Sequence, residues 1–433
     1  MTDADRTRYA ELLFAGCNPQ PGQNLLLSGE PEQWPLLLKI AEVAYDSGVR
    51  FVDVRSLPGA LSRARALHSR DDFLSYQPES RLQYYKNLVE EEWAVISVRG
   101  PEDPDILSDV APGVLGRLTE GDSRVRKPFR DALRRDDLHW LVCSAPTRGW
   151  AKKVLVPKGT PEELWEKLKP ILRLNSDDPV SAWWTHLETL VDRARLLTEM
   201  QPAALHFEGG GTDLIVPMNQ NHVWLGGGAT GADGRRFSPN LPTEEVFTTP
   251  FSGHPEAVPG GETAAARGPA ALPGAGSPGP EGRVALSRPA LVLGKEVEDA
   301  VLTFKAGEVV AVTAATNADT LETFVALDEG TKRMGEIALV DSSSPIYQSQ
   351  TVFFDTLLDE NAACHFALGF GYPDGVAGGL DADEEKLTQL GVNVSRHHLD
   401  FMFGHRELAV TALTPEGESV PIMVNGRFLE AFR

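Results

Sequence analysis

The chain has 433 residues, of which 42% are apolar and 24% are charged, and this composition is ordinary for a soluble globular protein with two or three domains. Its formal net charge is −21 at pH 7. An acidic protein repels nucleic-acid backbones and anionic membrane surfaces, so both are disfavoured as principal partners and metal cations are favoured.

Cysteine content and hydropathy favour a cytoplasmic protein. The three cysteines, Cys17, Cys143 and Cys364, are widely spaced and odd in number, which fits a reducing compartment better than a disulfide framework. The N-terminal residues show no basic flank followed by a long apolar run, so no export signal is expected. No uncharged apolar span approaches the roughly 20 residues of a membrane helix, so we expect no membrane partner.

The first part of the chain alternates short apolar runs with amphipathic segments, which is typical of β-α-β units and predicts an α/β domain with a mainly parallel sheet. The expected strands are NLLLSG at 24–29, FVDVRS at 51–56, WAVISV at 93–98 and HWLVCSA at 139–145. A helix is expected between the first two strands and should end at Gly48. Thr160, Pro161 and Glu163 form the pattern of a capping box, which predicts a further helix start.

From about residue 203 the pattern changes to short strands with glycine-rich turns, which predicts a C-terminal β-rich domain built on antiparallel, barrel-like sheet. We place the two domains at 1–180 and 181–433. Gly, Pro and Ala dominate residues 254–283, and such a stretch cannot bury enough apolar surface to offset its ordering entropy. A flexible insertion is therefore expected there, and the strand pattern returns after it in AVLTFKAGEVVAVTA.

Histidines cluster near the C-terminus, where His365, His397, His398 and His405 lie within one short region. Histidine is the commonest metal ligand, so clustering indicates a site. In an extended strand, His398 and Asp400 of VNVSRHHLDFMFG point to the same face and could bind one ion, while His397 points the other way. The equally weighted alternative is that Asp400 only accepts a hydrogen bond from His398.

Two glutamates could complete a metal site. Glu245 in TEEVFTTP and Glu336 in MGEIALV each precede apolar, strand-favouring residues, where a carboxylate is not the expected core residue. Carboxylates that share two cations hold them about 3.5 to 4 Å apart, a spacing at which water between them is ionised. Each glutamate alone would be interpreted as a strand end that faces water.

The stretch DENAACHFALGFGY, residues 359–372, mixes Asp359, Glu360 and His365 with apolar and small residues. Buried charges are costly unless they have a partner such as a cation. Cys364 is expected to be a packed residue rather than a nucleophile. The sequence contains no HExxH, GxSxG or GxxxxGK[ST] motif, and its glycine-rich segments lack the context of a dinucleotide-binding fingerprint.

Four segments together, NLPTEEVFTTP, MGEIALV followed by SSSPI, DENAACHFALGFGY and NVSRHHLDFMFG, resemble the aminopeptidase T family, a thermophilic metalloprotease-like family of two-metal metalloaminopeptidases that includes aminopeptidase S. The resemblance extends to RYAELLFAGCNPQPGQ and GGTDLIVPM and covers nearly the whole chain apart from the insertion. It implies that the metal ligands are Glu245, Glu336, His365, His398 and Asp400. It also implies that Glu336 bridges the metals and that Tyr372 contacts a metal or the developing oxyanion.

The same resemblance implies an α/β domain followed by a β-rich metal-binding domain, in a homodimer. The implied activity is that of an aminopeptidase that releases N-terminal amino acids from peptides with a free N-terminus, through a hydroxide bound to two divalent ions. Zinc, cobalt, manganese or magnesium could serve. Asp359 and Glu360 would orient ligands or the peptide amine, and the insertion would border the cleft and limit substrate size. Two alternatives stay open: another two-metal hydrolase such as an amidase or phosphoesterase, or a non-catalytic binding protein on the same fold.

Overall fold

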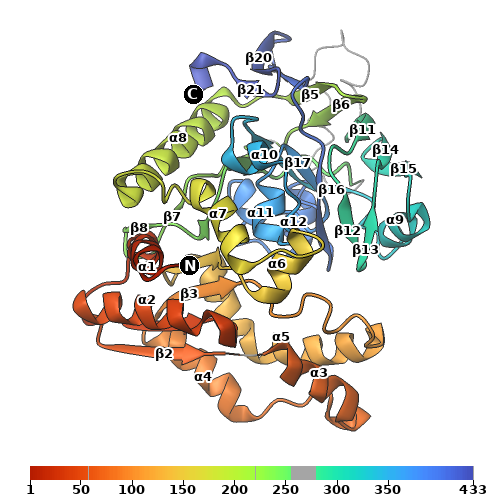
Figure 1. Cartoon of the computed structure of the whole chain (residues 1–433). Coiled ribbons are helices and arrows are strands. Elements are labelled where there is room, and N and C mark those ends of the chain that lie inside the picture. Colours follow the sequence, from red (N-terminus) through yellow and green to blue (C-terminus); the bar gives the residue numbers. More distant parts are fainter. Residues whose placement is uncertain (57, 220, 255–278, 433) are drawn as a thin grey trace. The chain divides into compact units, whose positions relative to one another are not determined.

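The computed structural model describes residues 1–56, 58–219, 221–254 and 279–432 (Figure 1). The chain forms two compact units, one of Met1–Thr185 with Gly228–Pro242 and one of His186–Gly227 with Thr243–Arg433. Helix α8 (Pro179–Met200) carries the chain from the first unit into the second. The division into domains at residue 180 stays a prediction.

The first unit contains a five-stranded parallel sheet in the order β2-β1-β3-β4-β9. Its strands are β1 (Asn24–Ser28), β2 (Phe51–Arg55), β3 (Ala94–Arg99), β4 (Trp140–Ser144) and β9 (Asn240–Leu241). The first four confirm the predicted strands apart from their end residues. Residues 228–242 belong to this unit because β9 pairs with β4, and they also form the hairpin of β7 (Ala229–Thr230) and β8 (Arg236–Phe237).

Helices cover this sheet on both faces (Figure 1). The helices of this unit are α1 (Asp3–Cys17), α2 (Trp34–Asp46), α3 (Gly59–His68), α4 (Glu79–Glu90), α5 (Pro112–Arg134), α6 (Arg148–Val154) and α7 (Pro161–Ile171). On one face α4 and α5 contribute Tyr85 and Phe129 to a core cluster with Leu26 and Val95 of the sheet. On the other face α1 and α2 contact the strands. These layers confirm the predicted α/β architecture of the N-terminal part.

Helix α7 begins at the predicted capping box. The Thr160 hydroxyl accepts the backbone N–H of Glu163 at 3.2 Å, and the Glu163 carboxylate accepts the backbone N–H of Thr160 at 2.9 Å. The two bonds satisfy amides that the first turn of a helix leaves unpaired.

The second unit contains two larger antiparallel sheets. The eight-stranded sheet has the order β15-β14-β11-β6-β5-β19-β20-β21, and the four-stranded sheet has the order β10-β16-β17-β18. The strands of the first are β5 (Ala204–Gly209), β6 (Thr212–Pro217), β11 (Glu281–Ala285), β14 (Val301–Lys305), β15 (Glu308–Thr313), β19 (Ala409–Leu413), β20 (Ser419–Val424) and β21 (Arg427–Phe428). Those of the second are β10 (Glu245–Thr248), β16 (Met334–Val340), β17 (His365–Gly369) and β18 (His398–Met402).

Antiparallel pairing confirms the prediction for the C-terminal part, but the expected barrel-like closure does not form. Within the described residues the eight-stranded sheet ends at β15 and β21, which do not pair with each other. Instead, side chains of both sheets meet in one core cluster, to which Phe207 and Val410 contribute from one sheet and Ile337 and Phe366 from the other. One face of the four-stranded sheet therefore packs in the core, and the side chains on its opposite face can be polar.

Short helices and one further hairpin join these strands. They are α9 (Ala318–Val325), α10 (Pro345–Ser349), α11 (Thr356–Glu360) and α12 (Glu384–Gln389), with β12 (Ala290–Val292) pairing with β13 (Lys295–Val297). The hairpin and α11 both contact β18. The hairpin and α11 thus pack against the outermost strand of the four-stranded sheet.

Most of the predicted insertion at 254–283, together with the role in limiting substrate size that we expected of it, lies outside the described residues. At its C-terminal end the prediction is wrong, because residues 281–283 begin strand β11 and find backbone partners in β6 and β14. Among the described residues, no helix has the length and apolar character needed to span a bilayer.

Candidate metal centre

The five ligand candidates named from the sequence come together on one face of the four-stranded sheet. They are Glu245 in β10, Glu336 in β16, His365 in β17, and His398 and Asp400 in β18. Alternation along each strand places the intervening large apolar residues on the core face. Four chain segments far apart in sequence thus supply one cluster.

Small residues separate the ligands across the sheet. Ala367 in β17 lies directly opposite Glu336 on one side and Asp400 on the other, and Gly369 lies opposite His398. Facing residues of an antiparallel pair have Cβ atoms about 4.5–5.5 Å apart, so a larger side chain at Ala367 would fill the space between the two carboxylates. The sequence reasoning missed this role, for which the signal is the alternation of small and large residues in HFALG.

A β-bulge turns Glu336 toward the other ligands. The register between β16 and β17 shifts between Met334 and Glu336, so Gly335 is an extra residue in the ladder. Met334 therefore packs in the core cluster while Glu336, two residues later, faces the ligands. A Cβ at Gly335 would lie 2.3 Å from the carbonyl oxygen of Gly369, so a side chain has no room there.

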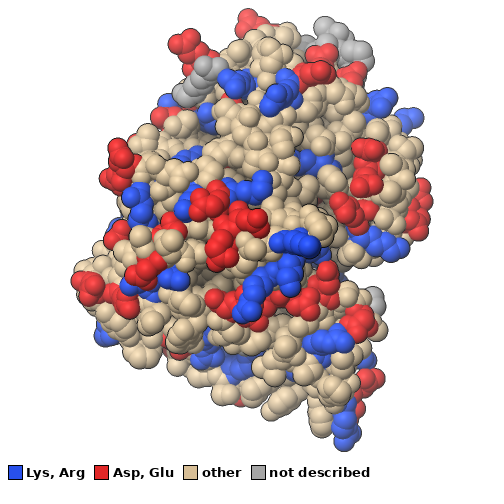
Figure 2. All heavy atoms as spheres, viewed as in Figure 1, with Lys and Arg blue, Asp and Glu red and all other residues tan. Residues whose placement is uncertain are grey.

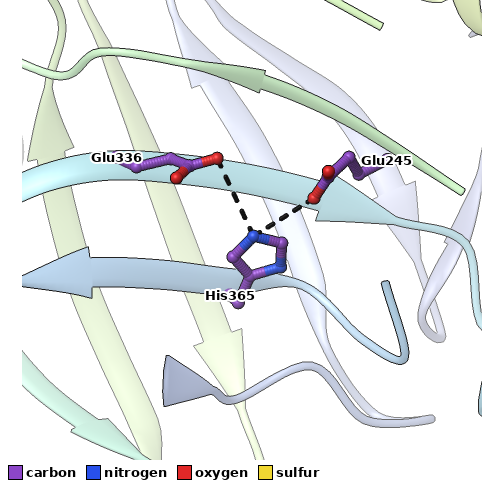
Figure 3. Close-up of side chains that lie close together, drawn as sticks. All are labelled: Glu245, Glu336 and His365. Carbon is purple, nitrogen blue, oxygen red and sulfur yellow. Dashed lines mark ion pairs between the residues drawn. The ribbon is translucent and has the colours of Figure 1, made fainter. Parts of the chain in front are cut away.

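The imidazoles and carboxylates form two overlapping groups. In the first, His365 Nε2 lies 3.2 Å from Glu245 Oε2 and 3.8 Å from Glu336 Oε1 (Figure 3). In the second, His398 Nε2 lies 3.2 Å from Glu336 Oε2 and 3.3 Å from Asp400 Oδ1. Within each group the candidate ligand atoms lie within 4.8 Å of one another. Glu336 belongs to both groups and offers a different oxygen to each imidazole.

Backbone carbonyls orient both imidazoles. His365 Nδ1 lies 3.1 Å from the carbonyl oxygen of Ala363, and His398 Nδ1 lies 2.7 Å from that of Phe370. Each ring can donate its Nδ1–H to its carbonyl, which points Nε2 toward the carboxylates. Histidines that bind metals are commonly held in this way.

Burial and the closely spaced charges shift the proton affinities of the cluster. Burial, reinforced by the charges of Glu336 and Asp400, raises the pKa of Glu245 to about 8 against the effect of the imidazoles. Burial disfavours charged imidazoles, but hydrogen bonds to carboxylates and carboxylate charges prevail, raising the pKa of His365 to about 10 and that of His398 to about 11. For Glu336, the imidazole hydrogen bonds outweigh burial and lower the pKa to about 2. Without a cation, both imidazoles hold their protons tightly.

This donor set fits divalent cations. Glu245 Oε2 and Asp400 Oδ1 are buried and accept no well-directed hydrogen bond from the described residues, although each lies within ion-pair distance of an imidazole. A buried polar atom without a directed hydrogen bond is costly, so these oxygens leave room for a further partner. A cation can replace the imidazole protons, and mixed imidazole and carboxylate donors suit several divalent metals.

Tyr372 lies beside the ligands. Its ring centroid is 4.9 Å from that of His398 and 5.6 Å from that of Phe247, and the hydroxyl of Thr249 donates to its carbonyl oxygen at 2.6 Å. Burial, together with the surrounding carboxylates, raises the pKa of its phenol well above the ordinary value. The phenol therefore remains a hydrogen-bond donor at neutral pH.

Asp359 and Glu360 have different surroundings, although they are neighbours in α11. Asp359 accepts the backbone N–H groups of Phe353 at 2.7 Å and Asp355 at 3.1 Å, which fixes the turn that precedes the helix. Glu360 lies near the ligands: burial first, and then repulsion by Glu245 and the other carboxylates, raises its pKa well above the ordinary value. Only Glu360 is thus close enough to interact electrostatically with the ligands.

The other residues singled out in the sequence lie outside the ligand groups. Cys364 is buried in the core cluster, which agrees with a packing role. The ring of His397 faces Phe324 at a centroid distance of 6.3 Å, as its position on the opposite side of the strand predicts. His405 Nδ1 accepts the backbone N–H of Glu407 at 3.0 Å.

Carboxylates and imidazoles gathered on one sheet face are a donor set suited to divalent metals, of the kind that metal-dependent hydrolases use. The chain belongs to the thermophilic metalloprotease (M29) family, whose model matches residues 2–266 and 277–428. The unmatched residues 267–276 fall within the Gly/Pro/Ala stretch. The match confirms the resemblance drawn from the motifs.

Relatives of known name align over nearly the whole chain. The chain is 35% identical over 425 residues to aminopeptidase 2 of Geobacillus stearothermophilus, covering 97% of each chain. It is 33% identical over 428 residues to aminopeptidase T of Thermus thermophilus, covering 98% of each. The solved structure of wild-type AmpT from Thermus thermophilus matches with a TM-score of 0.85 at 32% identity, covering 98% of this chain and 99% of that one.

Proposed function

We propose that the protein is a metal-dependent aminopeptidase that releases N-terminal amino acids from peptides and uses two divalent cations. The observation that carries the two-metal part is Glu336, whose carboxylate oxygens face different imidazoles. The first cation would be held by Glu245, Glu336 and His365. The second would be held by Glu336, His398 and Asp400. The names of the full-length relatives support the peptidase activity.

When bound, the cations supply an ionised water and polarise the first peptide carbonyl. Glu336 would be shared by the two cations, and the hydrogen bonds between Nδ1 and the backbone carbonyls hold the rings of His365 and His398 in place. Tyr372, whose phenol stays protonated, would donate a hydrogen bond to the oxyanion that develops on the carbonyl. Glu360, once bound cations offset the repulsion by the other carboxylates, would accept hydrogen bonds from the α-ammonium group and so align the N-terminus.

Charge distribution supports a peptide substrate rather than a polyanion. The formal net charge of −21 attracts a cationic N-terminus and repels nucleic acid. On the face in Figure 2, acidic and basic side chains are interspersed over the surface. We further propose zinc, cobalt, manganese or magnesium as the cation. We also propose a cytoplasmic location, which the three widely spaced cysteines support, and a homodimer, which the family resemblance implies.

Glu336→Gln tests this function, because it removes the shared ligand while keeping the shape of the side chain. Protein loaded with each metal would be measured for metal content and for hydrolysis of amino-acid 4-nitroanilides. We expect two ions and release of the N-terminal amino acid for the unchanged protein, and loss of both properties for Glu336→Gln. Glu416→Gln, an exposed carboxylate in the turn before β20, is the matched control and should change neither.

Two outcomes contradict the proposal. One is an unchanged protein that binds no divalent ion and cleaves no anilide or peptide. The other is a metal-loaded protein that cleaves phosphoesters, or peptides with an acetylated N-terminus, faster than peptides with a free one.

A further inference from the structure

A cavity of about 140 Å³ lies beside the candidate metal centre. Asp400 and Glu360 form part of its wall, and both also belong to the charged cluster described above. The remaining wall comes from β18, from the β12–β13 hairpin with the residues before it, and from α11 with the segment that leads into it. An open space therefore adjoins the position where the reacting bond would lie.

The topology explains why this space exists. Strand β18 is the outer strand of the four-stranded sheet, so on one side it has no partner strand in that sheet. The hairpin and α11 contact β18 from that side, and the backbone N–H of Ser287 donates to the carbonyl oxygen of Met402 at 2.9 Å. The cavity remains between these elements, along the strand that carries His398 and Asp400.

The wall is mainly apolar. Its apolar side chains include Pro289, Leu291, Val352, Phe354, Leu399 and Met402. Two half-buried charges in the wall are engaged within the protein: the Arg288 guanidinium donates to the carbonyl of Thr351 at 3.1 Å, and Asp359 accepts two backbone N–H groups. Glu296, also in the wall, is exposed to solvent. A group that enters the cavity consequently meets mostly apolar surface, together with the carboxylates of Glu360 and Asp400 near the ligands and those of Glu296, Asp355 and Asp359 in the rest of the wall.

Building on the proposed aminopeptidase function, we infer that this cavity is the specificity pocket for the first side chain of the substrate and that it selects large aliphatic or aromatic residues. The carbonyl and the amine of that residue must both lie at the charged cluster, so its side chain departs from a point between them and can reach the cavity. An apolar protein cavity of about 150 Å³ is known to hold benzene, which makes the size suitable. An acidic side chain would have to leave water for this mainly apolar wall, so it is disfavoured.

Val352→Phe tests the pocket, because Val352 is half-buried in the wall and is not a ligand. The measurement is kcat/KM of the metal-loaded protein for the 4-nitroanilides of Ala, Leu, Phe, Lys and Glu. The unchanged protein should favour Leu and Phe over Ala by about tenfold or more, since one added methylene in an apolar pocket is worth about 10- to 200-fold. Val352→Phe should lower the Leu-to-Ala ratio by about tenfold or more.

The matched control is Val310→Phe, which makes the same change in β15 at a side chain that is 56% exposed and lies outside the cavity. It should leave the ratio unchanged. Val352→Ala enlarges the pocket and should raise the Phe-to-Leu ratio, so it decides the matter if Val352→Phe does not fold. Calorimetric binding of 2-phenylethylamine, an amine with the phenylalanine side chain, should weaken in Val352→Phe but not in Val310→Phe.

The outcomes separate the two proposals. An active enzyme that favours Lys or Glu substrates, or whose substrate ratios do not change in either Val352 variant, overturns the pocket assignment and leaves the aminopeptidase function standing. If the unchanged protein hydrolyses no substrate with any metal, the proposed function fails, and the amine-binding measurement alone decides whether the cavity accepts large apolar groups.

Discussion

Ala367→Val should weaken cation binding without removing a ligand. Ala367 is fully buried and lies opposite Glu336 on one side and Asp400 on the other. Its neighbours across the sheet are about 4.5–5.5 Å away at Cβ, so the added methyl groups would lie between the two carboxylates. The ligands would all remain, but they could no longer close on the ions.

The size of the effect follows from the cost of overpacking. Extra methyl groups in a closely packed site typically cost about 1–3 kcal/mol. Because the strain arises when the carboxylates close around the ions, the affinity should fall roughly 5- to 150-fold, given that about 1.4 kcal/mol corresponds to tenfold. Calorimetric titration of metal-free protein with Zn²⁺ or Co²⁺ measures the affinity. Urea unfolding with and without metal measures how much of the stabilisation by metal is lost.

Ala412→Val is the matched control, because Ala412 is equally buried but lies in β19, in the core cluster and away from the ligands. Overpacking there should lower the unfolding free energy of the metal-free protein by about 1–3 kcal/mol and leave the metal affinity unchanged. Ala367→Val should lower the metal affinity and leave the unfolding free energy of the metal-free protein nearly unchanged. If Ala367→Val binds two ions with the affinity of the unchanged protein, then the small size of Ala367 does not set the spacing between Glu336 and Asp400, and the prediction is refuted.

Three further predictions concern Tyr372, the two imidazoles of the candidate metal centre, and the capping box of α7. Tyr372→Phe should lower kcat about 10²- to 10³-fold with metal content unchanged, and steady-state kinetics showing an unaltered kcat would rule out the oxyanion role. Metal loading at pH 7 should release protons, because pKa values of about 10 for His365 and about 11 for His398 mean that both rings are protonated beforehand, so affinity should rise with pH. Calorimetry in buffers of different ionisation enthalpy measures the number of protons released. If no proton is released, the rings are already neutral at pH 7 and the prediction is wrong. Thr160→Ala should lower the unfolding free energy by about 1 kcal/mol in urea, whereas an unchanged value would mean that the capping box of α7 contributes nothing.

Local patterns predicted the parallel strands of the first unit, since a buried strand needs a short apolar run and β1, β3 and β4 each have one. Strand β9 has only two residues and no such run, so its return to the parallel sheet depends on pairing with β4. The barrel expectation failed for a related reason. Many short strands indicate antiparallel sheet, but closure depends on whether the outermost strands meet, and nothing local in the sequence determines that.

In the candidate site, too, local patterns predicted some features, and others depended on contacts between distant segments. The period of two along a strand was enough to place His398 and Asp400 on one face, and their side chains lie 3.3 Å apart. The hydrogen-bond and metal-ligand interpretations of this pair are not exclusive, since His398 Nε2 also approaches Glu336. The residue pattern made Glu245 and Glu336 candidates for one site, but it could not show that they converge, because that depends on the register between strands separated by long stretches of chain. The family resemblance implied it.

The MGE segment explains how one strand serves both the core and the ligands. Strict alternation would place Met334 and Glu336 on the same face of the strand, so either Glu336 would point into the apolar core or Met334 would point toward the ligands. The bulge at Gly335 adds one residue to the ladder and separates their directions, which lets Met334 pack in the core while Glu336 reaches both imidazoles. A side chain at Gly335 would strike the carbonyl oxygen of Gly369. The glycine before the shared ligand is therefore a requirement of the strand geometry, and the position of the break in alternation decides which carboxylate can span both groups.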